Sequence, residues 1–230
     1  MDDARQRPAV TALEGRRLYL CTADRPDLED FLRECIRGGV DVVQLRDKRL
    51  DARDLISRAE RAMAVCAEHG VPFVLNDRPD LALAAGADGV HVGQDDTPPA
   101  VARQILGPDA IVGLSTHALS EWAAAESEPV DYLSAGPVTP TPTKPGRPGT
   151  GVGYLREVAS TPQGRLDGRP WFVTGGVTPE TIPAMAAAGA RRFVVVRYLT
   201  ESGEPQSAAR ALRKVIDEQA GWGPAVCEPL

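Results

Sequence analysis

The amino-acid sequence predicts an α/β fold, a single-domain (β/α)₈ barrel of the TIM type. Eight short apolar runs alternate with longer helical patterns along 230 residues, and the composition does not change between the two halves. A doubly wound sheet is the main alternative, but it would place a glycine-rich phosphate loop after its first strand. Here the residues after that strand, 21–25, read CTADR. We therefore favour the barrel.

The eight predicted strands are four to six residues long and mostly apolar. They cover residues 18–22, 40–45, 73–76, 89–92, 111–115, 132–136, 171–174 and 193–196. Near-continuous apolar runs are typical of parallel strands that are buried on both faces. They are therefore expected in a barrel, where helices cover the outer face of each strand.

Helical patterns follow most of these strands. Residues 28–37 place apolar side chains on one face at offsets of three and four, and residues 52–69 continue this period up to a glycine, a typical helix stop. Later, Thr178, Pro179 and Glu180 have the order of an N-cap, a first-turn proline and an early acidic residue. This order predicts that a helix begins at Thr178.

The last helix is predicted over residues 205–221, and the tail of residues 222–230 shows no periodic pattern. The barrel would then span about residues 17–221, after a short polar N-terminal segment. A dense run of prolines and glycines lies at residues 136–154. As a linker it would interrupt the repeating pattern between the sixth strand and its helix, so we interpret it as a functional loop.

Composition and charge exclude several classes of protein. The chain is 43% hydrophobic and 25% charged, as in an average soluble protein, and its net charge of −6 offers no basic surplus for nucleic acid. Only 5% of residues are aromatic, too few for base-stacking platforms. No segment approaches the roughly 18 consecutive apolar residues of a membrane helix. We expect no nucleic-acid or membrane partner, and the oligomeric state stays open, a homo-oligomer included.

The cysteines and the N-terminus indicate a cytoplasmic protein. Residues 1–8 are polar and of mixed charge, unlike a signal peptide. The four cysteines show no CxxC spacing, which is typical of reduced structural thiols. They are Cys21, Cys35, Cys66 and Cys227.

Polar side chains gather where the predicted strands end, which is the end of a barrel that carries active sites. Gln44, Arg46 and Lys48 alternate along the end of the second strand, so in an extended chain they point the same way. Two cations and an amide on one side suit an anionic, hydrogen-bonding ligand. A solvated edge where a strand meets its loop is the other interpretation.

Two carboxylates follow neighbouring strands. Asp77 comes after Asn76 at the end of the third strand, and Asp96 follows the fourth. Neighbouring strand ends lie close together in a barrel, so Asp77 and Asp96 could share one Mg²⁺, with substrate phosphate oxygens and water completing its ligands. Helix capping is the alternative for Asp96 alone, but the pair favours a metal.

The histidines and one serine give a weaker signal. Ser115, at the end of the fifth strand, could donate a hydrogen bond to a phosphate. His117 could transfer a proton, although the sequence shows no partner for it. His91 falls inside the fourth strand and is predicted to be a hydrogen-bonded core residue.

The last three strands complete two anion sites, and the first of these, for diphosphate with Mg²⁺, also includes Arg46, Lys48, Asp77 and Asp96. The loop after the sixth strand offers Thr141, Thr143 and Lys144 and has no acidic residue from 136 to 154, which suits a diphosphate; recognition of its prolines by another protein is the alternative. The glycine pair ending at Gly176, followed by the predicted helix start, suits a monophosphate, and Arg197 at the end of the eighth strand adds a cation. Two phosphorylated ligands in one pocket indicate a transferase with a diphosphate leaving group.

In their order along the chain, these motifs resemble the thiamine phosphate synthase family. The resemblance covers about residues 18–196. It rests on the runs QLRDK at 44–48, ND at 76–77, GQDD at 93–96, GP at 136–137, TPTK at 141–144 and GG at 175–176. The family couples 4-amino-2-methyl-5-(diphosphooxymethyl)pyrimidine to a thiazole ethyl phosphate, releasing diphosphate and giving thiamine monophosphate. Its reaction is regarded as dissociative, with diphosphate leaving before the thiazole nitrogen attacks.

The resemblance implies a role for each matching residue. Asp77 and Asp96 would ligate Mg²⁺, and Ser115 would lie beside the pyrimidine and its leaving group. Residues implied for the pyrimidine diphosphate are Gln44, Leu45, Arg46, Asp47, Lys48, Asn76 and Lys144. Residues implied for the thiazole phosphate are Thr141, Pro142, Thr143 and Gly176. We also expect Val196 and Arg197, at the end of the eighth strand, to bind this substrate. The catalytic group would be Arg46, Lys48, Ser115 and Lys144.

Two departures and two alternatives accompany the resemblance. Where the family often carries a small hydroxyl residue at the end of strand eight, this chain has Arg197. The loop at 145–149 could close over the site. A thiazole tautomerase on the same fold would depend on a group such as His117 rather than on paired carboxylates. A non-catalytic sensor of thiamine precursors would have no need to keep every ligand.

Overall fold

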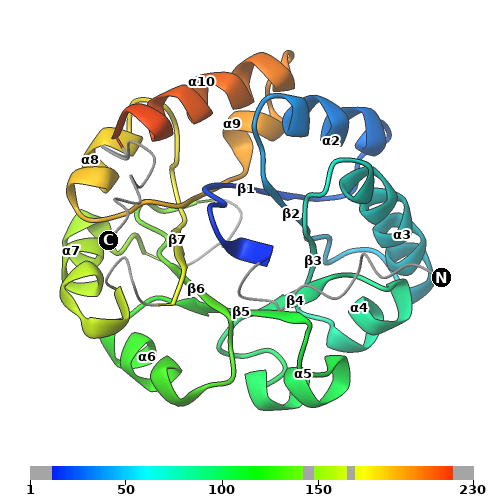
Figure 1. The fold of residues 1–230 in the computed structure, drawn as a ribbon, viewed down its shortest axis with the longest axis horizontal. Coiled ribbons are helices and arrows are strands. Elements are labelled where there is room, and N and C mark those ends of the chain that lie inside the picture. The colour runs from blue at the N-terminus through cyan, green and yellow to red at the C-terminus, as the bar shows by residue number, and fades with distance from the viewer. Residues whose placement is uncertain (1–11, 142–147, 165–168, 220–230) are drawn as a thin grey trace, which may run out of the picture.

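Eight parallel strands form a closed barrel in the computed structural model, which describes residues 12–141, 148–164 and 169–219. Each strand pairs with the next along the chain, and β1 pairs with β8 to complete the ring. Figure 1 looks into the barrel and shows the helices arranged around its outside. The predicted (β/α)₈ fold class is confirmed.

All eight predicted strands are present, with ends that differ from the prediction by at most two residues. They are β1 Leu18–Thr22, β2 Val42–Leu45, β3 Phe73–Asn76, β4 Gly89–Val92, β5 Ile111–Thr116, β6 Tyr132–Ala135, β7 Trp171–Val173 and β8 Phe193–Val195. The α-helices are α2 Leu28–Arg37, α3 Ala52–Glu68, α4 Pro79–Ala85, α5 Pro99–Leu106, α6 Leu119–Ala124, α7 Gly151–Ser160, α8 Ile182–Ala187, α9 Arg197–Thr200 and α10 Pro205–Gln219. Short 3₁₀ turns, η1 Ala125–Ser127 and η2 Pro162–Gly164, follow α6 and α7.

The prediction that a helix begins at Thr178 is wrong. Thr178 opens a turn in which its N–H donates to Thr181 Oγ1 at 2.9 Å, and α8 begins only at Ile182. Thr181 Oγ1 also donates to the Gly176 carbonyl at 2.7 Å. Thr178, which was predicted to cap a helix, therefore forms hydrogen bonds within the loop after β7 instead.

The end of the eighth strand also differs from the prediction. β8 ends at Val195, Val196 precedes the first turn of α9, and Arg197 is the first residue of that short helix. The Arg197 side chain therefore extends from a helical turn beyond the C-terminal ends of the strands, rather than from a strand.

Strand alternation separates the core into two layers. Outward residues such as Leu18 and Leu20 pack beneath the helices. Inward residues of the N-terminal half of the barrel form a second apolar cluster, which the segment before β1 completes by crossing the barrel opening (Figure 1). This inner cluster consists of Leu13, Tyr19, Val42, Val74, Ile111, Tyr132 and Phe172. Because apolar side chains fill the N-terminal half, polar groups find space only toward the C-terminal ends of the strands.

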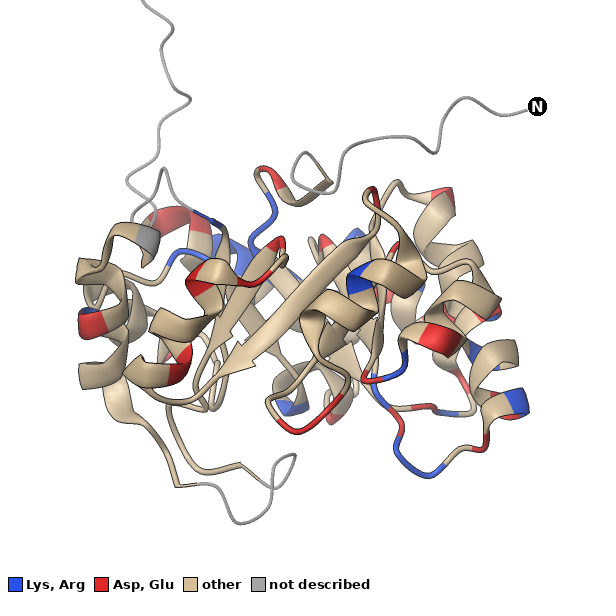
Figure 2. Ribbon diagram, turned by 90° about the horizontal axis from the view of Figure 1, so that it is seen from below, with Lys and Arg blue, Asp and Glu red and all other residues tan. Residues whose placement is uncertain are grey.

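Charged loops lie at the edge of the barrel toward which the strand arrows point, at the bottom of Figure 2.

Within the described ranges, no helix is both long enough and apolar enough to cross a membrane. Cys21, Cys35 and Cys66 are buried and form no disulfide among the described residues, and Cys227 lies outside those residues.

Candidate active site

A cavity of about 440 Å³ opens at the C-terminal ends of the strands. Its wall draws on residues from every quarter of the barrel, from Tyr19 on β1 to Arg197 on α9. Most of the residues predicted from the sequence line it. These are Gln44, Arg46, Lys48, Asn76, Asp77, Asp96, Ser115, Thr141, Gly176, Val196 and Arg197. The topology thus brings together side chains that the sequence separates by more than a hundred positions.

Of the described residues predicted to bind substrate, two do not line the cavity. Leu45 points outward from β2 into the core beneath the helices, because it alternates with Gln44 and Arg46. Asp47 is held in its own loop, where Oδ1 accepts the Arg49 backbone N–H at 2.8 Å and Oδ2 accepts from the Arg49 guanidinium at 2.8 Å. These contacts lower the pKa of Asp47, the guanidinium contributing most. Asp47 therefore shapes the loop that carries Lys48.

The Asp77 carboxylate lies among the charged side chains that line one side of the cavity, with Arg46, Lys48 and Asp96. It forms an ion pair with Lys48 at 2.9 Å, and its backbone N–H donates to the His91 carbonyl at 2.8 Å. Burial raises the pKa of Asp77, and the adjacent Asp96 carboxylate raises it further, while Lys48 opposes both. The Asp77 backbone has a φ of 63°, a left-handed conformation that aspartate tolerates better than most residues and that occurs at functional sites.

Asp96 does not cap a helix. Its Oδ2 accepts the Gly93 backbone N–H at 2.9 Å, within the loop after β4. The residue that precedes α5 is Pro98, and no side chain caps that helix. The capping alternative for Asp96 is therefore wrong, and its carboxylate lies beside that of Asp77.

The two carboxylates fit a shared divalent cation. Adjacent like charges that raise the pKa of Asp77 would be relieved by a cation between them. In the described ranges, this site included, no group of three or more His, Cys, Asp or Glu side chains could hold a metal ion. A metal held by Asp77 and Asp96 would thus need ligands from a substrate, which is how Mg²⁺ is commonly bound beside phosphates.

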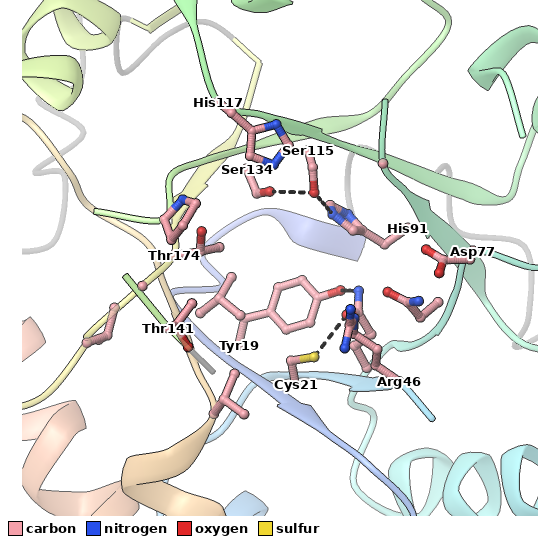
Figure 3. A pocket seen from close by; sticks show the side chains of 18 of the residues that line it. Tyr19, Cys21, Arg46, Asp77, His91, Ser115, His117, Ser134, Thr141 and Thr174 are labelled. Atoms are coloured by element: carbon pink, nitrogen blue, oxygen red, sulfur yellow. Dashed lines mark hydrogen bonds between the residues drawn. The ribbon is translucent and has the colours of Figure 1, made fainter. Parts of the chain in front are cut away.

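Hydrogen-bonded side chains line the floor of the cavity, and the sequence did not single out most of them. His91 is 9% exposed and binds at both ring nitrogens, Nδ1 to Tyr132 Oη and Nε2 to Ser115 Oγ, each at 2.9 Å. The prediction of a hydrogen-bonded His91 is confirmed, but this histidine also faces the cavity. Ser134 Oγ donates to Ser115 Oγ at a long 3.4 Å (Figure 3). Strand alternation was the signal that could have placed Tyr132 and Ser134 inside the barrel.

His117 has a partner that the sequence analysis missed. Its Nδ1 lies 2.9 Å from Glu121 Oε2, and the same oxygen accepts the His117 backbone N–H at 2.7 Å. A spacing of four residues at the start of a helix is a readable signal for such a contact. His117 therefore sits in the cavity wall already bound to a carboxylate.

The opposite wall is built from the loops after β6, β7 and β8. Gly175 and Gly176 adopt φ of 91° and 74°, and a Cβ on Gly176 would overlap the Thr139 side chain. Only glycine permits this backbone and this close approach. Thr141 and the exposed Arg197 line the same wall. The remaining predicted residues of this loop, Pro142, Thr143 and Lys144, lie outside the described residues.

The charges form two groups within one cavity. Arg46 and Lys48 stand with Asp77 and Asp96 on one side, and the glycine turn and Arg197 stand on the other. Cations beside a carboxylate pair suit a polyphosphate with a metal, while glycine amides and one arginine suit a single phosphate.

The relatives found by sequence and one solved structure have closely related names. The sequence profile of a family described as thiamine monophosphate synthase matches residues 18–199. A thiamine-phosphate synthase of Mycobacterium sp. strain KMS is 45% identical over 221 residues, covering 91% of this chain and 96% of the relative. One of Thermobifida fusca strain YX is 49% identical over 207 residues, covering 88% and 93%. The solved thiamine phosphate pyrophosphorylase of Pyrococcus furiosus matches with a TM-score of 0.78 at 30% identity, over 89% of this chain and 97% of that one.

Proposed function

The chain belongs to the thiamine monophosphate synthase family and is a transferase, and we propose that it joins 4-amino-2-methyl-5-(diphosphooxymethyl)pyrimidine to a thiazole ethyl phosphate. Diphosphate is released and thiamine monophosphate is formed. The observation that carries this proposal is the pairing of two distinct anion-binding walls in one cavity, one with Lys48 and Asp77 and one with Gly176 and Arg197.

The side of the cavity that carries Arg46 and Lys48 binds the diphosphate and stabilises its departure. Arg46 and Lys48 lie where negative charge grows as the bond from the methylene carbon to oxygen breaks. Because that charge is larger in the transition state than in the substrate, the two cations lower the barrier. Gln44 and Asn76 offer amide groups to the pyrimidine, and Ser115 donates to the leaving group.

Asp77 and Asp96 are the residues that would hold Mg²⁺. When bound, the ion would neutralise charge on the departing diphosphate. Lys48 already pairs with Asp77, so its ammonium is held beside the carboxylates and close to where the diphosphate would lie. Lys144, outside the described residues, is proposed as a further cation for the same group.

The second wall positions the thiazole phosphate. The turn at Gly176 exposes backbone amides, and Thr141 and Arg197 supply a hydroxyl and a cation from neighbouring loops. Val196 borders the same space, and we assign Pro142 and Thr143 to this subsite as well. Holding the thiazole nitrogen in line with the methylene carbon favours capture of the pyrimidine-methyl cation by proximity.

This dissociative route needs no general base at the bond-forming step. The thiazole nitrogen carries a lone pair, so no proton has to be removed before it attacks. The His117–Glu121 pair is therefore assigned no proton transfer here. Neither the tautomerase nor the sensor is favoured by the relatives, whose names are those of synthases.

Release of diphosphate from the purified chain tests the proposal. Reactions would contain both phosphorylated precursors, each precursor alone, and both with a chelator in place of Mg²⁺. We expect diphosphate only when both substrates and the metal are present. Parallel reactions with a carboxylated and an uncarboxylated thiazole phosphate identify the preferred acceptor. A change in thiazole absorbance without pyrimidine would instead indicate the tautomerase, and binding without reaction would indicate the sensor.

A further inference from the structure

A continuous row of hydrogen bonds crosses the barrel beneath the cavity and ends at Ser115. Gln44 Nε2 donates to Tyr19 Oη at 3.0 Å, and the hydroxyls of Tyr19 and Tyr132 lie 2.9 Å apart. Tyr132 Oη is 2.9 Å from His91 Nδ1, and His91 Nε2 is 2.9 Å from Ser115 Oγ. These side chains come from five different strands, β1, β2, β4, β5 and β6. Only closure of the barrel brings them into contact.

The partners of the first residues set the direction of this row. Cys21 Sγ donates to Gln44 Oε1 at 3.0 Å, which orients the amide so that its nitrogen faces Tyr19. Tyr19 therefore accepts a hydrogen bond and has one hydrogen to give. Its hydroxyl is buried, and among the described side chains only Tyr132 Oη is placed to accept that hydrogen. The opposite direction would leave a buried donor unsatisfied, which is costly.

The direction then passes to the histidine. Tyr132 accepts from Tyr19, so its own hydrogen goes to His91 Nδ1. A neutral imidazole that accepts at Nδ1 carries its proton on Nε2. His91 Nε2–H is then the donor to Ser115 Oγ.

We propose that Tyr19, Tyr132 and His91 form a one-way hydrogen-bond relay that fixes the Nε2–H tautomer of His91 and strengthens Ser115 as a donor to the departing diphosphate. The tyrosines and His91 are positioning residues, since each acts through the next. The last step rests on the role proposed above for Ser115.

Cooperativity supplies the physical reason. In a row of hydrogen bonds that all point one way, each bond polarises the next, and an oxygen that accepts becomes a better donor. Ser115 accepts from His91 and more weakly from Ser134, so its hydroxyl hydrogen becomes more positive. A stronger donor stabilises the growing charge of the leaving group more than it stabilises the bound substrate.

Burial keeps the relay intact. It raises the pKa of both Tyr19 and Tyr132, so neither hydroxyl loses its proton. The Tyr132 ring also stacks on the His91 ring with centroids 5.4 Å apart. A Cβ on Gly113 would overlap the Tyr132 ring, so this glycine provides the space that the relay needs.

The tautomer of His91 can be measured without any substrate. Imidazole ¹⁵N spectra of the wild-type chain would be assigned with His69→Gln and His117→Gln, because the chain has only three histidines. We expect His91 with a protonated Nε2 and an unprotonated Nδ1 that accepts a hydrogen bond. A proton on Nδ1, or on both nitrogens at neutral pH, would overturn the relay.

Kinetics test its effect. Tyr132→Phe keeps the ring but removes the hydroxyl between Tyr19 and His91, and Tyr154→Phe is the matched control. The Tyr154 hydroxyl donates to Thr116 Oγ1 at 3.0 Å outside the relay. For Tyr132→Phe we expect the single-turnover rate of diphosphate formation to fall about fivefold to tenfold, with both KM values within about twofold of wild type.

The possible results separate the relay from the proposed function. Wild-type rates for Tyr132→Phe, or an equal loss in Tyr154→Phe, would refute the contribution of the relay. An unchanged rate for Ser115→Ala would refute the proposed role of Ser115, even if the His91 tautomer is as expected. Absence of diphosphate release by the wild-type chain would refute the proposed substrates, while the spectra would still report on the relay.

Discussion

Replacing Asp96 by alanine separates the requirements of the fold from those of the reaction. For the fold, the Asp96 carboxylate accepts a hydrogen bond from the Gly93 N–H at 2.9 Å. A hydrogen bond to a charged group contributes about 1.5–3 kcal/mol, against a total stability of about 5–15 kcal/mol for a typical domain. We therefore expect Asp96→Ala to remain folded.

The reaction should lose far more. Asp96 is one of the two carboxylates assigned to Mg²⁺, and transition-state stabilisation by a metal amounts to several kcal/mol. About 1.4 kcal/mol corresponds to a tenfold change in rate. Losing one of the two carboxylates that would hold Mg²⁺ should therefore slow Mg²⁺-dependent diphosphate release at least about 100-fold. The pKa of Asp77 should also fall, because a neighbouring charge that raises it is gone.

The assay pairs turnover with direct binding. Diphosphate release is measured across a range of Mg²⁺ concentrations, and calorimetry follows Mg²⁺ binding in the presence of inorganic diphosphate. Asp80→Ala is the control, since Asp80 pairs with Arg78 outside the cavity and should leave both measurements unchanged. A folded Asp96→Ala with wild-type turnover and metal affinity would refute the paired-carboxylate site.

Three further predictions follow from the same geometry. Arg197→Ser should raise the KM for the thiazole phosphate about tenfold, as expected for loss of a charged hydrogen bond; a change confined to diphosphate affinity in steady-state kinetics would place Arg197 in the other subsite. Gly176→Ala should weaken thiazole phosphate binding at least tenfold, by about 1.4 kcal/mol or more, because the new Cβ would displace Thr139; unchanged affinity by calorimetry would contradict this. Asp47→Asn should lower the free energy of unfolding at pH 7 by about 1–2 kcal/mol. The pKa of Asp47 is below its unfolded value of 3.8, so the stability that its carboxylate contributes is present above pH 3.8 and is lost as the pH falls through the folded pKa. Denaturant titrations in which wild type and variant still differ by the same free energy of unfolding at pH 2 would refute this prediction.

The barrel and one wall of the site could be predicted from the sequence, because both depend on short-range regularities. Apolar runs of four to six residues mark strands buried on both faces. Strict alternation places Gln44, Arg46 and Lys48 on one side, and the structure has all three in the cavity. Asp77 and Asp96 could be paired because they follow strands that are consecutive in both sequence and space.

The contacts across the closed barrel could not be predicted, because they depend on which side chains the fold brings face to face. Tyr19 and Tyr132 are 113 residues apart, and nothing local in either strand indicates that their hydroxyls meet. The same holds for His91 and Ser115, which lie on different strands 24 residues apart and meet at 2.9 Å inside the barrel. A strand pattern fixes which face a residue occupies. Its partner is fixed by closure of the ring and by the need of every buried polar group for a hydrogen bond, and these are properties of the whole chain.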